Sequence, residues 1–168
     1  KIDGFINVDK YDTYKPDIVH DLENFPYPFK DNSVTEILLS HVLEHLGQNP
    51  DIFNSIIKEL YRISINGCLI DIRVPHPRHD DFLSDPTHVR PITILTLSLY
   101  DKQLNLKWEK DGAANTPLAI INNVNFVIKD VRYKLDQKYE NLIKENKEKK
   151  EKLDDYAHKY NNVIKEIK

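Results

Sequence analysis

Three short apolar runs near the beginning of the chain each end at a polar or charged residue. Runs of this length that are rich in Val and Ile are typical of buried strands in a parallel sheet. In open α/β sheets the ligand lies beyond the carboxyl ends of the strands. The pattern therefore predicts an α/β fold in which these polar residues line a binding edge. The runs are residues 6–8, 18–19 and 34–39, followed by Asp9, by His20 and Asp21, and by Ser40 and His41.

The segment after the third run predicts a helix and then a fourth strand. Asn49 suits the N-cap of a helix and Pro50 suits its first turn. Over residues 51–63 the apolar residues recur three and four positions apart, which gives one apolar face. Asn66 and Gly67 predict a turn into a strand within residues 68–77, which its prolines end. This alternation of strand and helix supports a parallel sheet.

The next part of the chain predicts a polar loop over residues 78–92 and a short helix over residues 93–101. Two further segments, residues 106–110 and 124–135, are expected to form antiparallel strands that complete the sheet. Residues 1–131 are accordingly expected to form one α/β domain, a size that suits a single core.

Residues 132–168 carry mostly apolar or neutral positions spaced alternately four and three apart, with charged residues between them and the charged Lys149 as an exception within the seam. A heptad seam of this length is typical of a coiled coil. The pattern predicts one long helix that projects from the domain and forms a homodimer through residues 133–168. A solvated helix or a charged tail is the alternative. The seam positions are Leu135, Tyr139, Leu142, Asn146, Lys149, Leu153, Tyr156, Tyr160, Val163 and Ile167.

Composition narrows the class of protein. The net charge of −3 argues against general affinity for nucleic acid, which favours a basic surface. The single cysteine, Cys68, excludes an internal disulfide and suits a reducing cytoplasm, so we expect a cytoplasmic protein. The sequence shows no apolar run near the roughly 20 residues of a membrane span, so no membrane partner is expected.

The motif PFKDNSVTEILLSHVLEHL, residues 28–46, follows the two aspartates in an order that resembles class I S-adenosylmethionine-dependent methyltransferases. The resemblance implies a Rossmann-like, mostly parallel sheet with antiparallel C-terminal strands. It also implies S-adenosylmethionine as cofactor, with Asp9 accepting hydrogen bonds from the ribose hydroxyls. By the same resemblance Asp21 receives the adenine amino group, the backbone amide of Leu22 meets the ring, and His41 faces the cofactor.

Such enzymes begin with a strand and a glycine-rich loop that lies under the amino-acid part of the cofactor. The chain holds four glycines and no GxG sequence, so we expect that strand and loop upstream of Lys1. If the loop is truly absent, a non-catalytic methyltransferase fold that acts as a dimeric scaffold or partner-binding module is the alternative.

A second cluster of ionisable residues fills positions 75–90, directly after the fourth strand. Its sequence DPTHVR resembles a signature of uncharacterised methyltransferase-like proteins, some of them linked to polysaccharide synthesis. Transfer to a hydroxyl needs a base, and an imidazole suits that role near neutral pH. We therefore expect His88 as the base, Asp85 orienting it, and Arg90 holding an anionic acceptor. The expected acceptor is a small polar molecule, such as a sugar or sugar-phosphate hydroxyl.

In the motif after the third run, Glu44 and His45 can hold the loop or approach the acceptor, or they can only cap the next helix. Two other interpretations of the cluster at positions 75–90 stay open. It can be a structural loop in which Asp85 caps a turn and pairs with Arg90. His76, His79 and His88 can alternatively bind a divalent metal, as in a metal-dependent hydrolase. Their spacing matches no recognised closed ligand set, so the sequence alone predicts no metal site.

Overall fold

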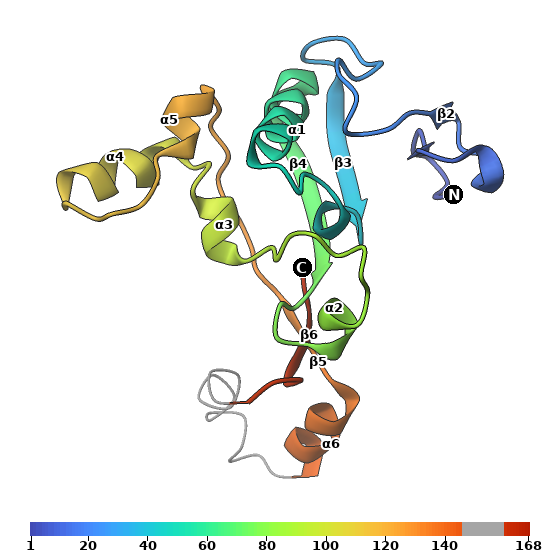
Figure 1. Ribbon diagram of the computed structural model, residues 1–168, viewed down its shortest axis with the longest axis vertical. Coiled ribbons are helices and arrows are strands. Elements are labelled where there is room, and N and C mark those ends of the chain that lie inside the picture. The colour runs from blue at the N-terminus through green and yellow to red at the C-terminus, as the bar shows by residue number, and fades with distance from the viewer. Residues whose placement is uncertain (146–159) are drawn as a thin grey trace.

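The computed structural model describes residues 1–145 and 160–168 of the chain (Figure 1). Its strands are β1 (Val8–Asp9), β2 (Ile18–Val19), β3 (Val34–Ser40), β4 (Ser64–Pro75), β5 (Tyr133–Leu135) and β6 (Ile164–Ile167). Its α-helices are α1 (Pro50–Ile63), α2 (Asp80–Leu83), α3 (Ile94–Ser98), α4 (Lys102–Lys110), α5 (Leu118–Asn122) and α6 (Gln137–Glu145). Two short 3₁₀ helices cover Asp12–Tyr14 and Leu43–His45.

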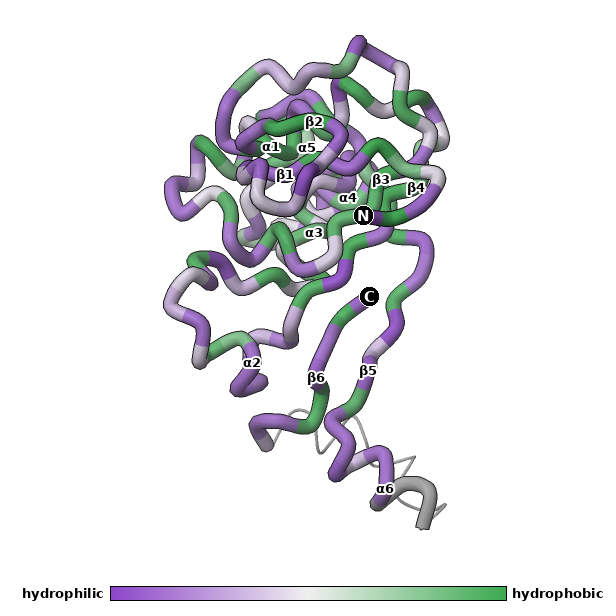
Figure 2. Tube along the Cα trace, turned by 90° about the vertical axis from the view of Figure 1, so that its right-hand side faces the viewer, coloured by the Kyte–Doolittle hydropathy of each residue, from purple (hydrophilic) through white to green (hydrophobic). Residues whose placement is uncertain are grey.

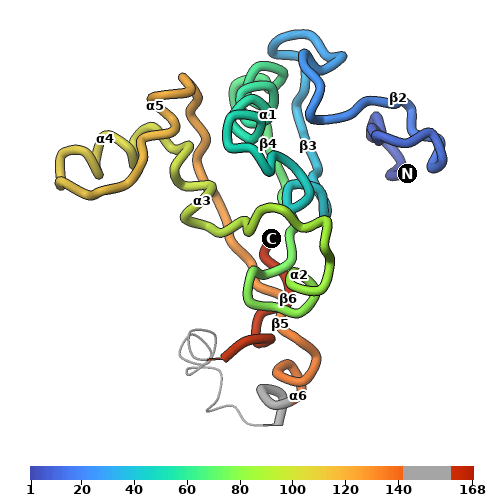
Figure 3. The backbone as a smooth tube through the Cα atoms, in the orientation of Figure 1, coloured from blue at the N-terminus to red at the C-terminus, as the bar shows by residue number. Residues whose placement is uncertain are grey.

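The strands form two groups. β1 and β2 make a parallel pair, and the other four form a sheet in the order β3-β4-β6-β5. β3 and β4 are parallel, whereas β6 runs antiparallel to both of its neighbours. The β1–β2 pair lies beside β3, on the side away from β4 (Figure 3). The parallel strands predicted from the first apolar runs are therefore confirmed. Antiparallel strands do complete the sheet, but they are β5 and β6, and β6 lies in the segment predicted to be a coiled-coil helix.

Helix α1 forms for the reasons that its sequence suggests. The Asn49 side chain accepts a hydrogen bond from the Asp51 amide at 2.8 Å, and Pro50 occupies the first turn. The apolar face of the helix is buried against β3 and β4, which gives the chain its core. The buried members of this core are Tyr27, Leu39, Leu43, Phe53, Ile56, Ile57, Leu60, Ile63, Val74, Ile92, Tyr100, Ala119 and Val124.

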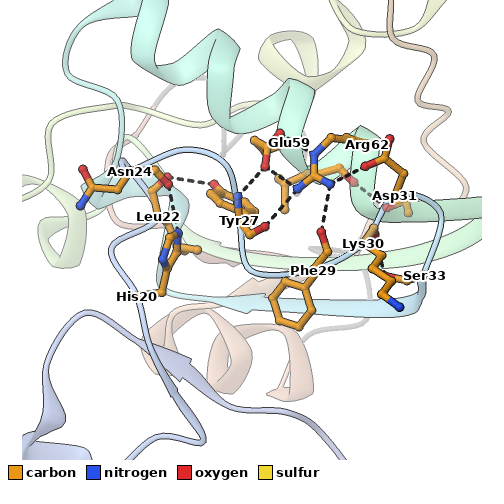
Figure 4. A network of polar contacts seen from close by, with 12 residues as sticks. His20, Leu22, Asn24, Tyr27, Phe29, Lys30, Asp31, Ser33, Glu59 and Arg62 are labelled. Atoms are coloured by element: carbon orange, nitrogen blue, oxygen red, sulfur yellow. Dashed lines mark hydrogen bonds and ion pairs between the residues drawn. The ribbon is translucent and has the colours of Figure 1, made fainter.

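The connection from β2 to β3 is held on α1 by a polar network centred on Arg62 (Figure 4). The guanidinium donates to the carbonyl oxygens of Tyr27 and Phe29 at 3.2 and 2.9 Å, and to the Asp31 carboxylate at 2.6 Å. Glu59 accepts from the guanidinium at 2.7 Å and from the Tyr27 amide at 2.6 Å. Every polar group of this network thus has a partner, and the loop is fixed in place.

Strand β4 is longer than the sequence predicts. It begins at Ser64, directly after α1, and the expected turn at Asn66 and Gly67 lies within it. Gly67 has a φ of +84°, which favours glycine, and the pairing with β3 shifts register at this point. The residues expected to form a turn instead form an irregularity inside the strand.

The strand predicted over residues 106–110 is wrong. These residues belong to α4, which the Asp101 side chain caps by accepting from the Leu104 amide at 3.0 Å. Of the strand predicted over residues 124–135, only Tyr133–Leu135 pairs with another strand. The helix expected over residues 93–101 is confirmed as α3, and the loop expected over residues 78–92 contains the short helix α2.

The long coiled-coil helix predicted over residues 132–168 is wrong at both of its ends. Leu135 lies in β5. Ile167 is the last residue of β6 and Val163 directly precedes this strand, which runs beside β5 (Figure 2). Val163, which the heptad pattern assigned to a helical seam, is buried here together with its neighbour Ile164, which was not a seam position. Helix α6 covers Gln137–Glu145, and positions 146–159 of the seam lie outside the described residues. The homodimer expected through residues 133–168 therefore loses the continuous helix on which it was based.

Within the described ranges, no helix has both the length and the hydropathy needed to cross a membrane.

Candidate functional site

The carboxyl ends of β1 and β2 carry the two aspartates predicted to hold a cofactor. Asp9 is the last residue of β1, and its Oδ1 accepts from the Tyr11 amide at 2.8 Å, which fixes the carboxylate in a turn. Asp21 follows β2 and accepts from the Glu23 amide at 3.0 Å. Leu22 packs against the core through its partly buried side chain. The structure thus places both carboxylates at one edge of the parallel pair, as the strand pattern predicts.

Asp21 also forms an ion pair with Lys10. Their side chains are 2.8 Å apart, and Lys10 is the residue after Asp9 on the neighbouring strand. The hydrogen bond from Lys10 holds the pKa of the Asp21 carboxyl below its usual value, so this group is ionised at neutral pH. An adenine amino group that binds Asp21 would share this carboxylate with Lys10 or would displace the Lys10 side chain.

The carboxyl end of β3 leads into a strained turn at His41. This residue has a φ of +53°, which is uncommon for any residue except glycine, and its amide donates to the Arg73 carbonyl at 2.8 Å. Its imidazole is about half exposed. Nδ1 is 3.3 Å from Glu44 Oε1, and Nε2 is 3.9 Å from Glu166 Oε2. His41 therefore stands between two carboxylates at the edge where β3, β4 and β6 end.

Glu44 is the most unusual residue of this edge. Its side chain is 0 % exposed, and neither carboxylate oxygen has a hydrogen-bond partner in the part of the chain that the structure describes. The contact between His41 Nδ1 and Oε1, at 3.3 Å, is close but lacks the geometry of a hydrogen bond. Burial of an ionised carboxylate without full pairing is strongly unfavourable in water-excluded surroundings.

The loop over residues 85–90 packs directly on Glu44. The Glu44 carbonyl accepts from the amides of Val89 and Arg90 at 2.9 and 3.1 Å, which joins the two segments. The rings of His45 and His88 then lie 4.6 Å apart in an edge-to-face arrangement. Motifs about forty positions apart in the sequence are therefore side by side in the molecule.

Asp85 and His88, predicted as an orienting acid and a base, are brought together by this loop. His88 Nε2 is 3.8 Å from Asp85 Oδ2, which is longer than a hydrogen bond. The stronger contacts of Asp85 are with Thr87, whose hydroxyl and amide both donate to Oδ1, at 2.6 and 2.8 Å. These bonds lower the pKa of the Asp85 carboxyl. The side chain of His88 is only 8 % exposed.

Arg90, predicted to hold an anionic acceptor, is engaged within the protein. Its guanidinium donates to the Gly47 carbonyl, from Nε at 3.0 Å and also from a terminal nitrogen. The same group lies over the Phe53 ring, 4.4 Å from the centroid. These contacts give Arg90 a structural role at the base of the loop, and a contact with an acceptor stays a prediction.

The three histidines proposed as alternative metal ligands do not form one group. His79 is buried and caps α2 by accepting from the Asp81 amide at 3.0 Å, while its Nε2 is 3.4 Å from Asp136. His76 Nδ1 accepts from the Arg78 amide at 3.2 Å. Among the described residues, the His, Cys, Asp and Glu side chains close enough to share a metal ion are instead Glu44, His45 and His88.

Comparison with solved structures identifies the architecture. No protein-family model matches the chain, and no curated protein matches its sequence. The fold matches the crystal structure of a SAM-dependent methyltransferase from Archaeoglobus fulgidus with a TM-score of 0.58, over 95% of this chain and 72% of that chain, at 18% identity. The chain has a methyltransferase fold. The Rossmann-like α/β class predicted from the sequence is thereby supported, without family-level support for the DPTHVR signature.

Sequence reasoning missed the grouping of Glu44 and His45 with His88. Glu44 and His45 were assigned together to the turn after the third run, and His88 was assigned to a separate motif as a base. A signal was present, because Glu-His immediately after a strand places two ligand-type residues at the functional edge. Which later histidine would join them depended on the path of residues 76–88, which the sequence does not determine.

Proposed function

We propose that the chain is an S-adenosylmethionine-dependent methyltransferase that acts on a small polar acceptor. The observation that carries the proposal is the position of Asp9, Asp21 and His41 at the carboxyl ends of β1, β2 and β3, in a chain with a methyltransferase fold. In this class of fold, ligands bind at that edge of the sheet.

The residues present fit the cofactor in chemical type. A carboxylate offers several lone pairs to a ribose diol, and Asp9 is held by a backbone hydrogen bond that leaves further acceptor capacity. Asp21 is an ionised acceptor for an amino group. When bound, S-adenosylmethionine supplies an electrophilic methyl group.

The segments 41–45 and 85–90 supply the acceptor side in this proposal. They meet beyond the end of β3 and carry most of the ionisable groups of the edge. Alignment of acceptor and methyl group accounts for much of the catalysis in such a reaction. A hydroxyl of a sugar or sugar phosphate is the acceptor class that we favour. The general-base role of His88 stays a prediction.

Calorimetric titration tests the cofactor site. S-adenosylmethionine and S-adenosylhomocysteine are titrated into the protein in the presence of a chelator, with Asp9→Ala and the distant surface variant Asp111→Asn as matched control. We expect micromolar binding to the wild type and the control, and loss of binding in Asp9→Ala. If the folded wild type binds neither compound, the enzyme proposal fails. A dimer mass in light scattering would then favour the alternative, a non-catalytic methyltransferase-fold scaffold.

A further inference from the structure

We propose that Glu44, His45 and His88 bind a divalent transition-metal ion. One ligand atom from each residue lies within 4.8 Å of the other two. The three come from two segments that backbone hydrogen bonds fasten together, so the group is built by the fold and not by chance proximity of surface side chains. This inference does not rest on the proposed methyl transfer, although it gives His88 a different role from the one predicted there.

The buried carboxylate of Glu44 is the first argument. Both of its oxygens lack a hydrogen-bond partner among the described residues, although the side chain is fully buried. Native proteins rarely leave such a group unpaired, and each exception calls for an explanation. A cation adjacent to the carboxylate removes the cost of its burial. The imidazole of His41 lies close to Oε1 but without the geometry of a hydrogen bond. The burial of Oε2 is not explained by this contact.

The tautomer of His88 is the second argument. Its Nδ1 lies 2.9 Å from the Phe82 carbonyl oxygen, which can only accept a hydrogen bond. Nδ1 therefore carries the proton, and Nε2 of the neutral ring presents a lone pair. The Phe82 ring stacks on the imidazole at a centroid distance of 5.3 Å and fixes its plane. A backbone carbonyl behind the ring is the arrangement that orients metal-binding histidines.

The same argument applies to His45 through Thr87. The Thr87 hydroxyl donates its only proton to Asp85 Oδ1 at 2.6 Å, because a carboxylate accepts. Its oxygen must then accept from His45 Nδ1, which lies 2.9 Å away. Nε2 of His45 is consequently the unprotonated atom. The chain from Asp85 through Thr87 to His45 is a carboxylate-backed outer shell of the kind found around metal-bound imidazoles.

The three ligands would have to move closer together to hold a small ion. Three atoms that are each about 2.1 Å from one metal lie about 3.4 to 3.6 Å from one another, so the group would close by up to about 1.4 Å. Two imidazoles and a carboxylate suit Zn²⁺, Mn²⁺, Fe²⁺ or Co²⁺ better than Mg²⁺. Three protein ligands with an open position are typical of catalytic metal sites. In this arrangement Nε2 of His88 binds the metal, which replaces its predicted role as a general base.

Metal binding is measured without S-adenosylmethionine, so failure of the proposed methyl transfer would not affect the result. Metal-stripped protein is titrated with Zn²⁺, Mn²⁺ and Mg²⁺, each alone, and the ions retained after dialysis are counted by elemental analysis. We expect one Zn²⁺ per chain, weaker binding of Mn²⁺ and the weakest binding of Mg²⁺. Glu44→Gln and His88→Ala should each weaken Zn²⁺ binding at least about 100-fold, and Thr87→Val by about 10- to 100-fold.

The variant His76→Ala is the matched control, since it removes an imidazole from the same loop region but not from the group. It should bind Zn²⁺ as the wild type does, and circular dichroism should show all variants folded. Zn²⁺ should also raise the melting temperature of the wild type but not that of Glu44→Gln. Folded wild type that retains no stoichiometric ion would overturn the proposal, as would unchanged Zn²⁺ affinity in both Glu44→Gln and His88→Ala.

Discussion

Two glutamates of the molecule, Glu59 and Glu44, are both shielded from water, but their surroundings differ. Glu59 accepts hydrogen bonds from Arg62 and from a backbone amide, so its charge is matched within the fold (Figure 4). Glu44 is more completely buried and has no hydrogen-bond partner among the described residues. The difference teaches that contacts within the fold explain the first carboxylate, whereas for the second we propose a metal ion as partner.

The largest expected effect comes from removing the partner of Glu59. Arg62→Ala leaves the carboxylate and two loop carbonyls without their donor, so we expect the free energy of unfolding to fall by about 3 kcal/mol. Urea unfolding followed by circular dichroism measures the change. Loss of less than about 1 kcal/mol would mean that water replaces the guanidinium, and the contrast with Glu44 would weaken.

The opposite sign is expected at the other glutamate. Glu44→Gln removes a buried, unmatched charge at constant shape, so in the presence of a chelator it should raise the free energy of unfolding by about 2 kcal/mol. The same urea experiment measures it. A destabilised variant would show that the carboxylate is satisfied in the metal-free protein, contrary to the contacts described here.

A smaller effect is expected in the pH dependence of stability. The Arg62 hydrogen bonds lower the pKa of Glu59 below its usual 4.5 in the folded protein. The ionised Glu59 therefore stabilises the fold fully at a pH above the pKa that this group has in the unfolded chain. This stabilisation is lost as the pH falls through the lower pKa of the folded protein. Wild-type stability should decline below about pH 4.5, whereas Arg62→Ala should show a flatter profile over the same range. Parallel profiles would remove Glu59 as the responsible group.

The smallest effect is expected for a carboxylate on the surface. Asp71 and Arg73 form an ion pair at 2.6 Å, with both side chains well exposed to solvent. Exposed pairs contribute little because water and salt screen them. Arg73→Ala should leave the urea midpoint unchanged within error. A clear shift would show that solvent exposure alone does not decide how much Glu59, Glu44 and Asp71 affect stability.

Patterns confined to one element predicted the fold well. The N-cap at Asn49, the apolar face of α1 and the run that forms β3 all depend on neighbours within a few residues. Strand β6 was missed because Val163 and Ile167 are four positions apart, which fits a helical seam, although Val163 is buried and Ile167 pairs with Val74 of β4. The segment forms a strand and not a helix because it pairs with a distant strand. No local pattern in the sequence reveals that pairing.

The candidate site was predictable in its residue types but not in its grouping. Asp9, Asp21 and His41 were found because they lie at or just after the carboxyl ends of strands, and these ends share one edge. The burial of Glu44 and its proximity to His88 depend on the loop that returns from β4 and bonds to the Glu44 carbonyl. Arg90 illustrates the same limit, since its preference for Gly47 and Phe53 is a property of the folded loop.

The pairing of β4 with β6 has a consequence for the order of folding. Val74 and Ile167 are partners across the sheet but lie 93 positions apart in the sequence, and β5 joins only through β6. Contacts at such separation form late, because the chain between them must first lose its freedom. The β3–β4–α1 unit is therefore expected to nucleate folding. His41, which faces Glu44 on one side and Glu166 of β6 on the other, would acquire its full surroundings only at the final step.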